Sequence, residues 1–404
     1  MKRTRRAVLL PVTIILAVVL ASGVALALPS ETPDATPMVN GQVRTFAQVG
    51  DNIWVGGNFT QVKRRDGTLI DNVSNVAVFD STTGAYVDIA PKLGEGSTTS
   101  NVRGIAVYGD DVVIGGVFAG PPNTNRKNLV VVDGANGVTG TQQPKWFNSE
   151  RLGSVLAAQD LGRIYGGGVR LSAFDFGSTT KLWSRATTTV DPDLRTHVLG
   201  AGYRDLERDG STIWAACGCD WVDGVPVKAL VKLNVEGNHD TSWFPQATGT
   251  GGFGISVTQD SGSLYLAAGG NDFVAKFAKA GTGTNIWRRD VSGSAQAVEK
   301  IDGQLVFGGH FVEVADAAPD FCGARTSNPG TLDPNDECQT RKGLAIYSFD
   351  GQLNSTWDPA LTGKYNLAWA LLPETTSQGT RLHVGGEFTH VNGIRQENYT
   401  RLSP

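Results

Sequence analysis

Ile53-Trp-Val-Gly-Gly-Asn-Phe59 is the stretch of sequence that decides the fold, because three near-copies of it recur along the chain. They are Val112-Val-Ile-Gly-Gly-Val-Phe118, Leu305-Val-Phe-Gly-Gly-His-Phe311 and Leu382-His-Val-Gly-Gly-Glu-Phe388. Each copy is an apolar run, typical of a buried strand, that ends in two glycines. A strand repeated in this way indicates an array of similar structural units.

Weaker copies begin at Arg163, Thr212 and Leu264, and the seven copies together recur at a mean spacing of about 55 residues. Turn pairs precede the glycine strands, apolar strands such as Val76–Asp80 follow them, and a tryptophan comes six residues after a glycine, as in Gly351 and Trp357. This pattern predicts an all-β fold, a seven-bladed β-propeller of four-stranded antiparallel blades. We expect the tryptophans to pack between blades.

The two ends of the chain predict how the ring closes. Pro37-Met-Val-Asn-Gly41 matches Pro359-Ala-Leu-Thr-Gly363, the segment that closes the sixth unit. The last residues, 399–404, read as a third strand with no fourth strand behind them. We therefore expect a ring closed by the N-terminal strand, which completes the last blade and covers its edge.

The first residues predict export. Lys2, Arg3, Arg5 and Arg6 precede an apolar run, and Ala25-Leu-Ala27 fits a signal peptidase site. Residues 1–27 are thus expected to be a signal peptide, with an uncleaved membrane anchor as the alternative. Residues 28–37 are expected to be a flexible leader, and residues 38–404 a single propeller domain in a secreted or otherwise extracytoplasmic protein.

Composition excludes several classes of protein. The chain has 39 acidic and 35 basic residues, 40% hydrophobic residues and a formal net charge of -4, a balance typical of a globular protein. Neither a disordered tail nor a nucleic-acid binder is expected, because a mildly acidic protein has no general attraction for polyanions. We expect a monomer whose only contact with a membrane would be an uncleaved anchor.

Four cysteines in an exported chain predict disulfides. Cys322 and Cys338 bracket the middle of a long insertion at about 315–342, and a bridge between them would stabilise that loop by about 3 kcal/mol. Cys217 and Cys219 are separated by one residue. A strained disulfide, two free thiols and part of a metal site all remain open for this second pair.

The repeat also resembles a known family. Leu382-His-Val-Gly-Gly-Glu-Phe-Thr-His-Val-Asn-Gly, followed by Asn398-Tyr-Thr-Arg-Leu402, is similar to the delta-60-type repeats of secreted bacterial β-propellers. The resemblance covers most of the chain after residue 37 and is strongest in the first two and last two units. It implies a propeller outside the cytoplasm and implies no particular catalytic residues.

Insertions fall mainly in the loops after the second strands, so we expect a ligand on the face that these loops share. The candidate residues of this binding face are Lys63, Arg64, Arg126, Asp220, Asp223, Arg325 and Arg341. The sequence carries no recognisable catalytic set or cofactor motif, and none for Ca²⁺. It predicts a secreted or cell-surface, non-catalytic binding scaffold whose partner is an extracellular protein or glycan. The alternative is an extracellular propeller enzyme, either a carbohydrate hydrolase or lyase or a quinone-dependent dehydrogenase.

Overall fold

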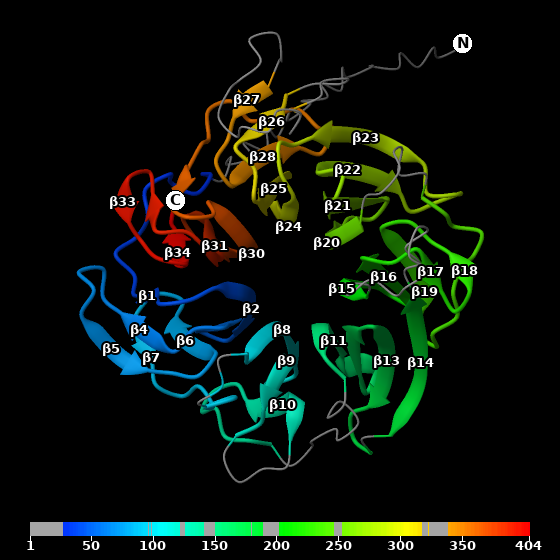
Figure 1. The fold of residues 1–404 in the computed structure, drawn as a ribbon, viewed down its shortest axis with the longest axis horizontal. Coiled ribbons are helices and arrows are strands. Elements are labelled where there is room, and N and C mark those ends of the chain that lie inside the picture. Colours follow the sequence, from blue (N-terminus) through cyan, green and yellow to red (C-terminus); the bar gives the residue numbers. More distant parts are fainter. Residues whose placement is uncertain are drawn as a thin grey trace, which may run out of the picture.

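A computed structural model describes residues 27–95, 97, 99–121, 126–140, 150–178, 180–188, 202–245, 253–316, 322 and 338–404. Antiparallel sheets follow one another along the chain and are arranged in a circle (Figure 1). Their first strands lie nearest the centre and are β2 (Val43–Val49), β8 (Asn101–Tyr108), β11 (Leu152–Ala158), β15 (Tyr203–Asp209), β20 (Phe253–Gln259), β24 (Ala295–Ile301) and β30 (Leu367–Thr376). We call these the inner strands.

The repeated glycine segments form the second strands, as the sequence predicted. They are β3 (Asn52–Gly57), β9 (Asp111–Ala119), β12 (Arg163–Gly168), β16 (Thr212–Cys217), β21 (Ser263–Gly269), β25 (Gln304–Gly309) and β31 (Gly379–Glu387). The third strands are β6 (Val76–Asp80), β10 (Lys127–Asp133), β13 (Arg170–Asp175), β19 (Leu230–Asn234), β22 (Phe273–Ala278), β28 (Leu344–Ser348) and β34 (Tyr399–Leu402). The one short helical turn in these ranges is the 3-10 segment Gln159–Leu161, and none of the described helical structure is long and apolar enough to span a bilayer.

Fourth strands are less regular than predicted. Within the described residues only β7 (Tyr86–Val87), β14 (Lys181–Thr188) and β23 (Asn285–Asp290) pair with a third strand as full strands. Elsewhere single bridges at Thr139, His239 and Leu353 take this position. The Asp240 and Asn354 side chains accept backbone hydrogen bonds from Ser242 and Thr356 just before the tryptophans, and such local turns compete with strand pairing.

Short strand pairs follow several second strands, and each pairs with a segment that lies before it in the chain. β17 (Trp221–Val222) and β18 (Val225–Pro226) join β14, and β32 (His390–Val391) and β33 (Ile394–Arg395) join β29 (Leu361–Thr362). β4 (Gln61–Lys63) and β5 (Leu69–Asn72) join β1 (Met38–Val39) in the same way. β26 (Glu313–Ala315) pairs with β27 (Cys338–Thr340) and forms a bridge to Val291 through Val314.

Apolar clusters fill the space between neighbouring sheets. One cluster combines Trp54 with Ile114, a second combines Ile346 with Val384, and a third contains both Phe79 and Tyr399. The rings of Phe79 in β6 and Tyr399 in β34 stack at 4.6 Å, so the last sheet packs against the first. Burial of aromatic and aliphatic side chains between sheets is the main stabilising contribution in such a fold.

The tryptophans link successive sheets, as predicted. The indole N–H groups of Trp183, Trp243 and Trp287 donate to backbone carbonyls at or just beyond the end of the third strand of the next sheet, those of Val235, Ala278 and Phe349, at 3.0 to 3.2 Å. Trp243 and Trp287 are buried and Trp183 is half-buried, and all three are satisfied as hydrogen-bond donors.

The segment expected to be a leader, residues 28–37, lies beside β34. The backbone N–H of Ser30 donates to the carbonyl of Ser403 at 2.7 Å, and that of Asp34 donates to Arg401 at 2.9 Å. The Asp34 carboxylate also pairs with the Arg401 guanidinium at 2.5 Å. These contacts place residues near the start of the described chain against its last strand. Residues 1–26 of the predicted signal peptide, which is residues 1–27, lie outside the described residues.

Candidate functional site

All seven inner strands contain a register shift against their second strand, so that one residue in each has no partner across the ladder. A bulge of this kind re-aims the side chain of the extra residue. The seven bulge residues are Arg44, Arg103, Gly153, Arg204, Ile255, Gln296 and Trp369.

The paired glycines explain why these bulges can form. The first glycine allows the next sheet to approach, since a Cβ at Gly56 or Gly115 would lie 2.5 Å from a methyl group of Val102 or Val155. The second glycine faces the bulge, since a Cβ at Gly57 would overlap the carbonyl oxygen of Gln42. The repeat that predicts the fold is therefore also what places the bulge residues.

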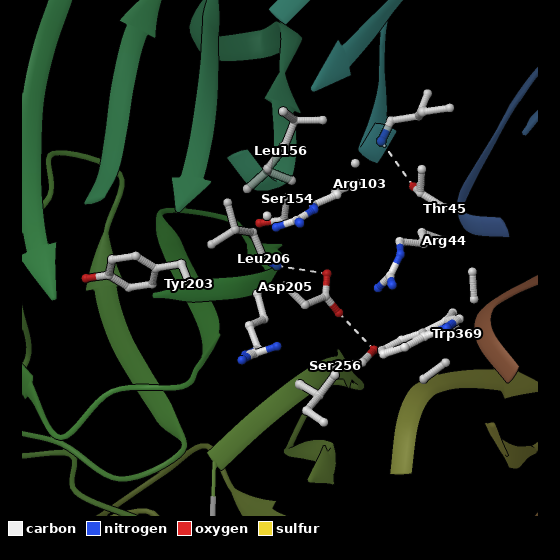
Figure 2. A pocket seen from close by; sticks show the side chains of 18 of the residues that line it. Arg44, Thr45, Arg103, Ser154, Leu156, Tyr203, Asp205, Leu206, Ser256 and Trp369 are labelled. Carbon is white, nitrogen blue, oxygen red and sulfur yellow. Dashed lines mark hydrogen bonds between the residues drawn. The ribbon is translucent and has the colours of Figure 1, made fainter. Parts of the chain in front are cut away.

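The bulge residues surround a cavity of about 710 Å³ at the centre of the circle of sheets. Figure 2 shows the side chains of Arg44, Arg103, Asp205 and Trp369 projecting toward the space that the inner strands enclose. Arg151, which precedes β11, and Glu299 on β24 also line the cavity. A concave site of this size is in the range of small-molecule binding pockets.

Four arginines crowd one side of the cavity. Burial and the Arg103 charge lower the pKa of Arg44 to about 10, burial and Arg151 lower the pKa of Arg103, and burial and Arg103 lower that of Arg204. None of the ion pairs in the described part of the chain includes Arg44, Arg103 or Arg151. The arginines therefore repel one another and create a local positive field.

Arg44 is held in place by its neighbours. Its guanidinium lies 4.1 Å from the centre of the Trp369 ring, and its Nε donates to the Gln42 side-chain oxygen at 3.1 Å. The Gln42 amide in turn donates to the Glu387 carboxylate. Stacking and hydrogen bonding fix the plane of this guanidinium, which is the geometry that favours bidentate contacts with an oxyanion.

Carboxyl groups also lie on the inner strands, among them one next to Arg204 and two further along their strands. Asp205 accepts hydrogen bonds from Ser256 Oγ and from the Val257 backbone N–H, both at 2.9 Å, and so joins β15 to β20. Glu207 lies two residues further along β15, and Glu299 occupies the matching position on β24. Burial, then the Asp205 charge, raises the pKa of Glu207 to about 7; burial and the Glu207 charge raise that of Glu299.

The predicted binding-face residues that the structure describes do not line this cavity. Arg64 and Asp220 are exposed, Lys63 is half-buried in β4, and the backbone carbonyl of Arg126 accepts a hydrogen bond from Gly120. Asp223 accepts a hydrogen bond from the Ala186 backbone N–H at 3.0 Å and thereby holds the β17–β18 hairpin to β14.

Arg341, a predicted binding-face residue, is buried. Its side chain is 6% exposed and its guanidinium donates to the backbone carbonyls of Thr340 and Asn354. The guanidinium folds inward and donates to these two carbonyls, so Arg341 does not present its charge to the solvent. Arg325 lies outside the described residues.

The cysteines form two bridges. The structure joins Cys322 to Cys338, with Cα atoms 5.8 Å apart, and Cys217 to Cys219, with Cα atoms 5.3 Å apart. The described residues contain no group of three His, Cys, Asp or Glu side chains arranged as metal ligands.

Sequence reasoning missed the bulge residues although a signal was present. Val43-Arg44, Val102-Arg103 and Tyr203-Arg204 are hydrophobic-arginine pairs at the same place in three repeats. An alignment of the first strands on the glycine pairs would have shown this recurrence.

Comparison with known proteins identifies the fold. No family model and no curated protein matches the chain. The solved WD40 repeats of RRP9 match 94% of this chain and 99% of theirs, with 10% identity and a TM-score of 0.56. The WD40 β-propeller domain of Doa1 matches 92% of this chain and 96% of its own, with 9% identity and a TM-score of 0.52. With its antiparallel sheets arranged in a circle, the chain is a β-propeller.

Proposed function

We propose that the protein is an extracytoplasmic, non-catalytic binding scaffold that holds its ligand on the loop-rich face of the propeller. By this face we mean the side on which the inner strands begin and the second strands end. Because neighbouring strands are antiparallel, the bulge residues and the hairpins after the second strands belong to this one side. The observation that carries the proposal is the cluster of four arginines in the cavity mouth of that side.

The proposal includes a ring of seven blades closed by the N-terminal segment. Trp357 supports it, because its indole donates at 2.8 Å to the Pro29 carbonyl, as the earlier tryptophans donate to Val235, Ala278 and Phe349. Since Ser30 and Asp34 hydrogen-bond to Ser403 and Arg401 at the end of the chain, residues 29–34 would complete the last blade.

Two further observations support closure. Val39 pairs with Val62 as Leu361 pairs with Val391, so β1 and β29 have the equivalence that the repeated Pro-x-x-x-Gly segments predict. A Cβ at Gly385 in the last sheet would overlap Val43 in the first, which is the same close approach that Gly56 makes to Val102.

We propose export of the chain by residues 1–27, with disulfides that form outside the cytoplasm. Two bridges among four cysteines favour an oxidising compartment. A binding scaffold exposed there needs a rigid frame, and covalent links limit local opening of its loops.

A blocking experiment tests which face binds. A screen of glycans, cell-wall fragments and peptides, run with Ca²⁺ and with chelator, first identifies a ligand. A bulky maleimide polymer is then attached to Arg64→Cys on the loop-rich face or to Gly262→Cys on a turn of the opposite face. We expect binding to be lost only with the first adduct. Equal binding by both adducts would place the ligand elsewhere.

One observation favours the enzymatic alternative, a carbohydrate hydrolase or lyase. Glu207 and Glu299 occupy matching positions on inner strands, and the raised pKa of Glu207, about 7, suits a general acid or base. Release of reducing ends from acidic polysaccharides, abolished by Glu207→Gln, would establish this alternative. Binding without release would support the scaffold.

A further inference from the structure

At the level of the bulge residues, the wall of the central cavity has a charged half and an uncharged half, and the carboxyl group of Glu299 lies three residues further along β24. Arg44, Arg103, Arg151 and Arg204 come from four consecutive sheets, from β2 to β15. The three remaining inner strands contribute Ile255, Gln296 and Trp369. A ligand that fits both halves carries negative charge on one side and an uncharged surface on the other.

The charged half is suited to an oxyanion. Guanidinium groups present parallel N–H donors that match carboxylate or phosphate oxygens. Arg103 is accessible to solvent in the cavity mouth, where the surrounding walls still partly desolvate it, and Arg44 is fixed by its stacking on Trp369. An anion bound between them would reduce the repulsion that the arginines exert on one another.

Groups suited to hydroxyls lie around the same cavity. Ser154 Oγ, on the charged half, and the Gln296 side-chain oxygen, on the uncharged half, have no hydrogen-bond partner among the described residues. Ser154 is 6% exposed, and buried polar atoms without partners are rare in folded proteins. The Asp205 and Glu299 carboxylates add acceptors to the lining. Acceptors on several sides, with an uncharged wall between them, suit a compact molecule that carries several hydroxyl groups.

We propose that the mouth of this cavity binds an acidic sugar, that is, a saccharide unit bearing a carboxylate or phosphate group. The arginines hold the anionic group, Ser154 and Gln296 hydrogen-bond to hydroxyls, and the ring lies along Ile255 and Trp369. The inference rests on the proposed function, because it assigns a ligand class to the same loop-rich face.

Titration calorimetry on the purified protein tests the proposal with four probes: glucuronate, glucose 6-phosphate, glucose and inorganic phosphate. We expect one or both acidic sugars to bind at least tenfold more tightly than glucose and than phosphate, and the preference between the acidic sugars identifies the anionic group. We expect added salt to weaken this binding.

Four variants locate the site. Arg103→Gln is expected to weaken binding of the acidic sugar about tenfold. Arg395→Gln, which removes the same charge from an exposed position on the hairpin β32–β33 outside the cavity, is expected to leave binding unchanged. Ser154→Ala is expected to weaken the acidic sugar severalfold and to leave phosphate unaffected. Unfolding curves check each variant, and Arg103→Lys, which keeps the charge but loses the planar fork, is expected to bind at an intermediate level.

Some results would overturn the inference. They are no binding of either acidic sugar, equal affinity for phosphate and acidic sugar, or equal losses in Arg103→Gln and Arg395→Gln. If a larger ligand binds the loop-rich face in the blocking experiment and Arg103→Gln has no effect on it, the scaffold is retained and the cavity site is refuted.

Discussion

Replacing Glu207 by glutamine is expected to stabilise the protein at alkaline pH and to leave its stability nearly unchanged near pH 4.5. Glu207 is half-buried on the inner strand β15, close enough to Asp205 and Glu299 for their charges to oppose its ionisation. Burial and these charges together raise its pKa to about 7 from an ordinary value of 4.5.

The magnitude follows from linkage between protonation and folding. A carboxyl group with a raised pKa binds its proton more tightly in the folded protein, so the free energy of unfolding falls as pH rises between 4.5 and about 7. The full difference between the folded and unfolded pKa values of Glu207 corresponds to about 3 kcal/mol in the free energy of unfolding. Glutamine has no charge to lose, so the variant should gain up to about 3 kcal/mol over the parent protein above pH 8, or about 4 °C in melting temperature for a chain of this size.

Urea unfolding at pH 5 and pH 8.5, followed by tryptophan fluorescence, measures this difference. Glu95→Gln is the control, because Glu95 is exposed and the substitution is chemically the same. The control should change stability by less than about 0.5 kcal/mol at either pH. A gain in Glu207→Gln that is the same at both pH values, or a loss at pH 8.5, would refute the argument from ionisation.

Three further predictions test the frame. Gly57→Ala should lower the free energy of unfolding in urea by more than about 2 kcal/mol, because its Cβ would overlap the Gln42 carbonyl. Gly262→Ala, with no atom within 4 Å of the new Cβ, should lower it by less than about 1 kcal/mol. Similar losses in the two variants would contradict the role given to the second glycine. Trp357→Phe removes the donor to Pro29 and should cost about 1 kcal/mol and speed proteolytic cleavage around residues 28–37, while unaltered cleavage would argue against this anchor. Replacing Cys322 and Cys338 together by serine should lower the free energy of unfolding, measured in urea without reductant, by up to about 3 kcal/mol. Reductant should lower the stability of the parent protein more than that of this variant, and the opposite order would contradict the prediction.

The strands were predictable because the physical cause of each is local. The apolar run and glycine pair at Ile53–Phe59 predicted β3, and Val76–Asp80 predicted β6 with the same bounds. The irregular fourth strands were not predictable, since Asp240 and Asn354 form turns that replace strand pairing and a tryptophan at a constant offset remains buried either way.

The cavity was harder to predict, for a reason of scale. The formal net charge of -4 argues against binding of anions, yet Arg44 and Arg103 lie on neighbouring inner strands and produce a local field of the opposite sign. Net charge averages over the surface, whereas a bulge brings single residues of distant repeats together. Arg341 is the opposite case, because this residue was predicted on the binding face and its side chain is buried.

The placement of the N-terminal segment has a consequence for the folding kinetics. Asp34 and Ser403, whose side chains hydrogen-bond at 2.6 Å, are 369 residues apart in sequence. Contacts between such distant residues require closure of a very long loop and are slow to form. They also cannot form during synthesis until Ser403 has been made. Residues 28–37 must therefore wait for the last strand, and the rate at which the first and last sheets meet should limit the formation of the complete structure.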